Sequence, residues 1–343
     1  MTSFSFAALT DVGTVRTNNE DSALASSGLL ALADGMGGHA AGEVASAVVM
    51  HSLGRLLSPA VDLTPDAMRE STFEARQTLR AMSRADHEME GMGTTLIALG
   101  VGPDGIALAH VGDSRIYRVR DGEVSQITAD HTHVQRLVDS GRLAPSEVRT
   151  HPYRSVILRS IDDTSDDLPD VAITHDIEPG DRVLLCSDGL SDYLDHDSLV
   201  HALLEGSPLE AARALLNGAL DAGTRDNVTV IVADVHGAEP SAGDSPDTGA
   251  GDGAGAGDEV PVLVGASLAQ AGLTAPARAV LLEAFPDAET LVDTLPRIPV
   301  DDADSDTLPT AKAVAMRAAG RREAAARAAS AAAAAGSSTN APA

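Results

Sequence analysis

Acidic residues stand where two apolar runs of this chain stop. Residues 29–33 are apolar and lead into Asp34 and a glycine, and the run at 183–187 leads into Asp188 and a glycine. A short apolar run bounded by glycine predicts a buried strand that ends in a turn. Two carboxylates that meet at strand ends suit a hard divalent cation. Because Asp-Gly is also a common turn, the prediction depends on how many acids converge.

Further acids occupy comparable places at expected strand ends or tight turns. An acid at a strand terminus reaches solvent and is still held by a rigid sheet. Several such acids repel one another unless cations neutralise them. With no cysteine among them, they predict oxygen-only coordination of Mg²⁺ or Mn²⁺. The alternative is a set of unrelated turn acids in an acidic protein. The set is Glu20, Asp21, Asp34, Asp113, Asp188 and Asp226.

A single arginine complements this acidic set. Arg16 lies in a polar loop that leaves the first expected strand and leads into Glu20 and Asp21. A guanidinium group beside a metal site can hold two oxygens of a phosphate. The alternative is a surface arginine that pairs with Glu20 or Asp21.

The elements that must position these groups follow from apolar spacing. Helices are expected at 42–57, 65–87, 134–140 and 199–219, with Thr64 as a cap and Pro65 near the start of the second. Strands are expected at 4–9, 94–99, 106–110, 115–120, 123–128, 181–186 and 227–234. Because the strands come in hairpin runs, the pattern favours stacked antiparallel sheets with helices outside.

Composition excludes several function classes. The 343 residues carry a net charge of −27, which disfavours a nucleic-acid backbone or an anionic membrane as partner. Cys186 is the one cysteine, so the chain has no internal disulfide and no cysteine zinc site. Its place in an apolar run indicates a buried side chain. With neither a signal peptide nor a membrane span expected, a cytoplasmic location is predicted.

The organisation of the chain changes after residue 236. Residues 1–236 are expected to form one domain, and residues 237–259 a flexible acidic linker rich in Gly, Ala, Asp, Ser and Pro. Residues 260–343 are expected to be a partly helical, Ala-rich tail, with one or two short helices within 260–295 and a basic helix within 310–335. That basic helix suggests a tail that folds back on the acidic domain or recruits an acidic partner.

Six ordered motifs resemble the metal-dependent protein phosphatases of the PPM/PP2C type, in the bacterial branch that opposes Hanks-type serine/threonine kinases. The resemblance covers about residues 4–236 and does not extend to the tail. The motifs are Thr10-Asp11-Val12-Gly13-Thr14-Val15-Arg16 through Asn19-Glu20-Asp21, Ala33-Asp34-Gly35-Met36-Gly37-Gly38-His39, Gly91-Met92-Gly93-Thr94-Thr95, Val111-Gly112-Asp113-Ser114-Arg115, Cys186-Ser187-Asp188-Gly189-Leu190 and Asp226-Asn227-Val228-Thr229.

The resemblance implies an α+β fold, a four-layer α-β-β-α sandwich of two antiparallel sheets flanked by helices. It also implies two to three Mn²⁺ or Mg²⁺ ions. Residues 130–155 correspond to the mobile flap of the family. The implied roles are Asp34 as the bridge between two metals, the Gly35 carbonyl, Asp188 and Asp226 as further metal ligands, Glu20 and Asp21 at or just behind the metals, Arg16 on the substrate phosphate, and Asp113 with Asp188 and the backbone near Ser155 at a third metal site.

The implied activity is hydrolysis of phosphoserine and phosphothreonine in proteins by a metal-activated water. Serine/threonine kinases and their substrates are the implied partners. Two alternatives are a pseudophosphatase that only binds phosphoproteins and a stress or sporulation regulator acting on an anti-sigma-antagonist phosphoprotein. Presence of Asp34, Asp188 and Asp226 argues against the first.

The proton donor to the leaving alkoxide is an open point. Met36 occupies the position at which eukaryotic relatives often have a histidine. His39 is one alternative, although it also suits a capping or packing role, and a metal-bound water is preferred. Three further histidines, His131, His133 and His151, are expected to tune the flap or to be solvated, and His110 to pack within a strand.

Overall fold

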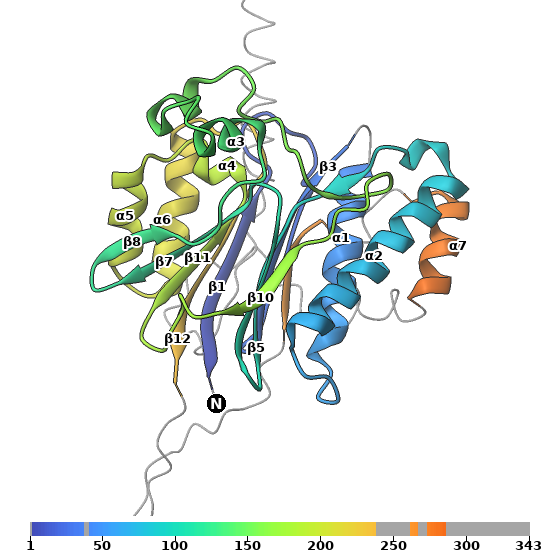
Figure 1. Ribbon diagram of the computed structural model, residues 1–343, viewed down its shortest axis with the longest axis horizontal. Coiled ribbons are helices and arrows are strands. Elements are labelled where there is room, and N and C mark those ends of the chain that lie inside the picture. The colour runs from blue at the N-terminus through green and yellow to red at the C-terminus, as the bar shows by residue number, and fades with distance from the viewer. Residues whose placement is uncertain (1, 38–40, 238–260, 267–272, 286–343) are drawn as a thin grey trace, which may run out of the picture.

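Two antiparallel β-sheets pack face to face, and helices cover the outer face of each (Figure 1). The structure is a computed structural model that describes residues 2–37, 41–237, 261–266 and 273–285. This arrangement confirms the expected four-layer sandwich. The expected linker and the basic helix within 310–335 lie outside the described residues.

The first sheet contains five strands and carries the beginning and the end of the expected domain side by side. Its order is β1 (Ser3–Asp11), β12 (Val228–His236), β11 (Arg182–Cys186), β7 (Arg115–Arg120) and β8 (Glu123–Gln126). Every neighbouring pair is antiparallel, as the hairpin pattern predicts.

The second sheet is built around β3. Its order is β10 (Asp170–Thr174), β6 (Gly105–Val111), β5 (Leu96–Gly102), β3 (Leu29–Met36), β2 (Asp21–Ala25) and β13 (Val262–Gly265). The end of β3 also pairs with β4 (Gly93–Thr94), which in turn pairs with β9 (Ile161–Asp162). β3 therefore changes partners along its length, from β5 to β4, close to Asp34.

Helices on each side follow from amphipathic spacing and from capping residues. Over the second sheet lie α1 (Ala41–Gly54) with the 3₁₀ turn η1 (Arg55–Leu57) and α2 (Pro65–Ala85) with η2 (His87–Met89), and α7 (Ala275–Ala284) packs against α2. On the first sheet lie α4 (Asp188–Ser191), α5 (His196–Leu204) and α6 (Pro208–Asp221). The flap region, residues 130–155, contains α3 (His133–Asp139) and η3 (Pro145–Thr150). None of the described helices is long and apolar enough to cross a membrane.

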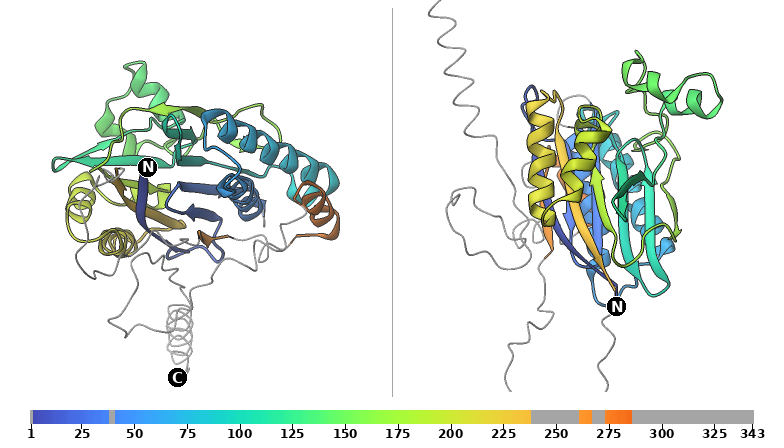
Figure 2. Two further views of the ribbon diagram at one scale, coloured as in Figure 1. Left: turned by 90° about the horizontal axis from the view of Figure 1, so that it is seen from below. Right: turned by 90° about the vertical axis from the view of Figure 1, so that its left-hand side faces the viewer.

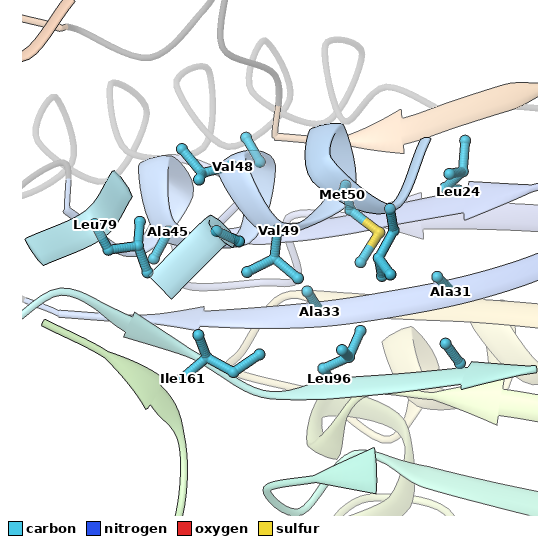
Figure 3. Packing of buried hydrophobic residues seen from close by; sticks show 14 of the residues in the cluster. Leu24, Ala31, Ala33, Ala45, Val48, Val49, Met50, Leu79, Leu96 and Ile161 are labelled. Atoms are coloured by element: carbon cyan, nitrogen blue, oxygen red, sulfur yellow. The ribbon is translucent and has the colours of Figure 1, made fainter. Parts of the chain in front are cut away.

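Small aliphatic side chains build the core, since the chain has few aromatic residues. Leu30, Leu32 and Ile97 of the second sheet meet Ile231 of the first between the two sheets. On the outer face of the second sheet, α1 lays Val49 and its neighbours over Ala31, Ala33 and Leu96 (Figure 3). Odd and even positions of β3 therefore face different cores, as the two-residue period of a strand requires.

Local signals explain several element boundaries. The Thr64 hydroxyl accepts a hydrogen bond from the Ala67 amide and caps α2, with Pro65 at its first position, as predicted. The helix expected over 199–219 is instead two helices. Ser207 caps the second and Pro208 begins it, and a proline in a helix interior would remove a hydrogen bond.

Other expectations about strands are corrected. The run 94–99 is divided between β4 and β5. The turn expected at Gly35 is wrong, because β3 continues through Asp34 and Gly35 to Met36. Within the described parts of 260–295, at 261–266 and 273–285, the structure has the strand β13, which was not expected, and the helix α7, which agrees with the expected short helix. Strands β2, β9 and β10 are short, and their sequences contain no clear apolar run. They are recognised only by their pairing with neighbouring strands.

Candidate active site

Asp21 and Asp34 lie directly opposite each other in the register of β2 and β3. Residues that alternate with them, Ala23 on β2 and Leu32 on β3, face the space between the two sheets. Because side chains on a strand alternate, both aspartates point to that same inner face. The acids therefore lie at the end of the layer where the two sheets meet.

The first sheet supplies polar groups to the same place. Ser187, at the end of β11, donates from its hydroxyl to Asp21 Oδ2 at 2.9 Å and accepts from the Thr229 amide at 3.0 Å. Asn227, just before β12, accepts from the Glu20 amide at 2.8 Å. Two segments of the first sheet thus hold the short stretch that carries Glu20 and Asp21.

The carboxylates are close enough to disturb one another's protonation. Burial raises the pKa of Asp34 well above its ordinary value, and repulsion from Asp21, Asp188 and their acidic neighbours raises it further. Burial likewise raises the pKa of Asp188, with Asp113 and Asp226 adding to the effect. Raised acid pKa values at one point indicate a site that lacks enough positive charge.

The neighbouring acids follow the same pattern. Burial raises the pKa of Glu20 to about 6, partly opposed by Arg16. Burial raises that of Asp21 to about 6, opposed by hydrogen bonds from Thr229 and Ser187. Burial and the charge of Asp130 raise that of Asp113 to about 7. A cation bound here would favour the ionised forms.

Gly35 lies where no side chain fits. A Cβ atom at this position would stand 2.1 Å from the Gly42 carbonyl oxygen and 2.5 Å from that of Glu20. The Gly35 amide donates to the Glu20 carbonyl at 3.1 Å. The start of α1, the end of β3 and the loop before β2 therefore approach closely only because residue 35 is glycine.

Arg16 binds two acids of the cluster. Its guanidinium group donates to Asp226 at 2.9 Å and to Glu20 at 3.3 Å, and 44% of the side chain is exposed. The alternative pairing with Glu20 is thus present, whereas the second ion-pair partner of Arg16 among the described residues is Asp226 rather than Asp21. An exposed guanidinium beside the acids is also accessible to a ligand, and its phosphate-binding role stays a prediction.

Asp113, Asp188 and Ser155 line one cavity of about 350 Å³ beside the acids. Ser155 is exposed at the end of the flap region. Arg149 and Arg154, from the same region, bind the carbonyl of Leu194 and both the backbone and the side chain of Asp192. The structure therefore brings the third-site residues of the sequence prediction to one cavity, although their role as ligands stays a prediction.

The donor set fits a magnesium or manganese ion in its chemistry. Oδ1 of Asp21 is buried without a hydrogen-bond partner, and the other groups offer carboxylate oxygens, which these ions prefer. Within the described ranges, however, no three acidic, histidine or cysteine side chains stand as a group that could hold an ion. Two of the acids, Asp226 and Glu20, form ion pairs with Arg16.

Two of the histidines contact each other. His131 is not solvated, because its ring stacks on His110 at 4.5 Å between centroids and its Nδ1 accepts from the Gly112 amide. His110 is buried within β6, as predicted. His39 lies outside the described residues. Cys186 is buried, and burial raises its pKa to about 12, which agrees with a packed rather than a reactive thiol.

Sequence reasoning missed three contributors. Asp192 raises the pKa of both Asp113 and Asp188, and its spacing of four residues after Asp188 would place both on one helical face. Ser187 and Asn227 lie within the ordered motifs, and the sequence alone indicates no role for either. Their cross-sheet hydrogen bonds join residues far apart in sequence, so only the fold shows them.

Comparisons with known proteins identify the family of this chain. The sequence profile described as protein phosphatase 2C matches residues 15–220. The chain is 46% identical over 233 residues to the serine/threonine protein phosphatase PstP of Mycobacterium tuberculosis. The aligned region covers 67% of this chain and 45% of PstP. It is 35% identical over 240 residues to the protein phosphatase PhpP of Streptococcus pneumoniae, covering 66% of this chain and 96% of PhpP.

Solved structures give the same result. The fold superposes on the crystal structure of M. tuberculosis PstP with a TM-score of 0.65 and 44% identity, covering 68% of this chain and all of that one. The PstP catalytic domain in complex with two manganese ions gives a TM-score of 0.64 and 43% identity, covering 69% and 100%. The chain therefore belongs to the protein phosphatase 2C family. The region matched in PstP is just under half the length of that relative.

Proposed function

We propose that this chain is a metal-dependent protein phosphatase that hydrolyses phosphoserine and phosphothreonine in proteins. The observation that carries the proposal is the pair of buried acids Asp34 and Asp188 at the junction of the two sheets, whose pKa values are raised by burial and by the charges of neighbouring acids that include Asp226. A manganese-containing relative of 43% identity supports the choice of metal. Because all three acids are present, a role limited to binding phosphoproteins is not favoured.

In this proposal Asp34, Asp188 and Asp226, with the Gly35 carbonyl, hold Mn²⁺ or Mg²⁺, and Asp113 with Asp188 and Ser155 holds a further ion. The bound metal supplies Lewis acidity and a nucleophilic water at neutral pH. Glu20 and Asp21 support the ligands from behind, with Asp21 oriented by the Ser187 hydroxyl at 2.9 Å.

Arg16 orients the substrate phosphate in this mechanism. To do so it must release Asp226 and Glu20, with which its guanidinium group forms ion pairs. A guanidinium group offers two parallel donors to phosphate oxygens and stabilises charge that develops on them. Ion binding at the acids and phosphate binding by Arg16 are coupled in this proposal, because Asp226 is both a proposed metal ligand and an ion-pair partner of Arg16.

Substrate identity and location belong to the same proposal. Serine/threonine kinases and their targets are the proposed substrates, in line with relatives named as serine/threonine phosphatases. A cytoplasmic site of action stays a prediction of the sequence. The test is release of phosphate from phosphoserine and phosphothreonine peptides with Mn²⁺, Mg²⁺ or EDTA. Activity that survives EDTA, or inactivity with both metals, contradicts the proposal.

A further inference from the structure

Residues beyond the family match return to the domain and pack on it. The family profile ends at residue 220, yet β13 pairs with the edge strand β2 and α7 lies along α2 (Figures 1 and 2). We call β13 with Ala266 and the stretch 273–285 the docked segment. By covering β2, it removes an exposed strand edge, which is otherwise a site of unwanted pairing.

Apolar contacts hold the docked segment in place. Ala277, Leu281 and Phe285 are buried in the core cluster that includes α1 and α2. The Phe285 ring meets the His51 ring edge-on at 5.0 Å, and the Arg55 guanidinium lies 5.7 Å from its centre. Burial of large apolar side chains favours the docked state, so α7 is anchored in the core rather than resting on the surface.

The other end of the docked segment reaches the backbone of Asp21. The Ala266 amide donates to the Asp21 carbonyl oxygen at 2.6 Å. Gly265 has φ +95°, and a Cβ atom there would stand 2.1 Å from that same oxygen. Only glycine permits this approach, because other residues are strained at that φ and would collide with the strand. The contact thus fixes the backbone of an acid of the candidate site.

A pair of buried hydroxyls extends the contact to Glu20. Ser22 Oγ donates to the Ala266 carbonyl at 3.1 Å and lies 2.9 Å from Ser46 Oγ. Ser46 Oγ donates to the Glu20 carbonyl at 2.6 Å. The two hydroxyl protons therefore serve two carbonyls, one in the docked segment and one beside the site. All these atoms are buried, where each hydrogen bond is expensive to leave unmade.

We propose that the docked segment is a positioning element for the acidic site. Its two backbone contacts fix the stretch that carries Glu20 and Asp21, and its anchoring helix keeps those contacts closed. Undocking would loosen that stretch and weaken Mn²⁺ binding, so the segment regulates the phosphatase through its metal affinity. The inference rests on the proposed function for the identity of the ion.

The test is a matched pair of substitutions on one helix of the full chain. Ala277→Asp places a charge in the buried contact of α7, whereas Ala279→Asp places the same charge on its exposed face. Free Mn²⁺ is followed by electron paramagnetic resonance during titration, and hydrogen exchange reports protection of the Ala266 amide. Leu281→Ala, a milder change at the same contact, is measured if Ala277→Asp does not fold.

We expect the buried substitution to raise the dissociation constant for Mn²⁺ by about threefold to tenfold. This effect is no larger than that of removing a residue that contacts a metal ligand directly, because the docked segment acts through the backbone. The same substitution should expose the Ala266 amide to hydrogen exchange. The exposed substitution leaves both unchanged. Loss of Ala266 protection with unaltered Mn²⁺ affinity overturns the inference. A wild-type chain that binds Mn²⁺ but hydrolyses no phosphopeptide contradicts the proposed function and leaves this measurement intact.

Discussion

Asp21 and Asp34 face each other across the β2–β3 ladder, on the inner face of the sheet. Like charges directly opposite on neighbouring strands destabilise a sheet. The fold keeps this pair because Ser187 binds Asp21 and because burial raises the pKa of both acids. Such a pair of carboxyl groups is stable when one of them is protonated or when a cation lies beside them. The pair is therefore suited to binding a cation.

Replacing one ligand carboxylate tests the metal assignment. We expect Asp34→Asn and Asp188→Asn each to lower Mn²⁺-dependent hydrolysis of p-nitrophenyl phosphate by more than about 100-fold, beyond the usual effect of groups that only orient ligands. An amide keeps the size of the side chain and removes its charge. Asp104→Asn, on the exposed β5–β6 hairpin, is the control. Wild-type turnover in either site variant would refute the assignment.

Removing Arg16 separates phosphate binding from ion pairing. We expect Arg16→Ala to raise KM for phosphopeptides by about 10-fold or more, because charge-assisted hydrogen bonds contribute about 1.5–3 kcal/mol. Mn²⁺ affinity should hold or rise, since Asp226 and Glu20 lose a competing cation. Arg84→Ala, exposed near the end of α2, is the control. An unchanged KM would leave Arg16 as a surface ion pair only.

The Ser187 hydroxyl is expected to act through Asp21. Ser187→Ala removes the donor to Asp21 Oδ2 and the acceptor for the Thr229 amide, both buried. We expect a loss of about 1–3 kcal/mol in the free energy of unfolding and about 10-fold weaker Mn²⁺ binding. Chemical denaturation and metal titration measure the two effects. Ser58→Ala, exposed after η1, should change neither, and intact metal affinity in Ser187→Ala would contradict the role.

Metal stabilisation should depend on pH. In the ion-free protein the pKa values of Glu20 and Asp21 are raised to about 6. The folded state then holds protons that the unfolded state releases, so their stabilisation is present at low pH and is lost as pH rises through about 6. Bound Mn²⁺ replaces those protons. We therefore expect the gain in Tm on adding Mn²⁺ over EDTA to be larger at pH 7 than at pH 5.

Thermal unfolding at several pH values measures this gain. The variant Asp21→Asn removes one of the two protons and should reduce the dependence on pH. A gain in Tm that is the same at pH 5 and pH 7 would show that these acids are already ionised without the metal.

Much of the site was predictable because its signals are local. Two kinds of signal depend only on residues that are close in sequence. These are the apolar runs that stop at Asp34 and Asp188, and the hairpins β5–β6 and β7–β8. Thr64 and Pro65 define the start of α2 by the same kind of short-range contact. Such features follow from strand period, turn chemistry and capping, and need no knowledge of distant partners.

The sequence by itself determined the acidic set, the antiparallel architecture and the family. Only the tertiary structure decided which side chains meet. It placed Asp34 inside a strand rather than in a turn, paired Arg16 with Asp226, and brought Ala266 to the carbonyl of Asp21. Those contacts join residues separated by most of the chain, and their geometry is set by sheet register and core packing, which no local pattern encodes.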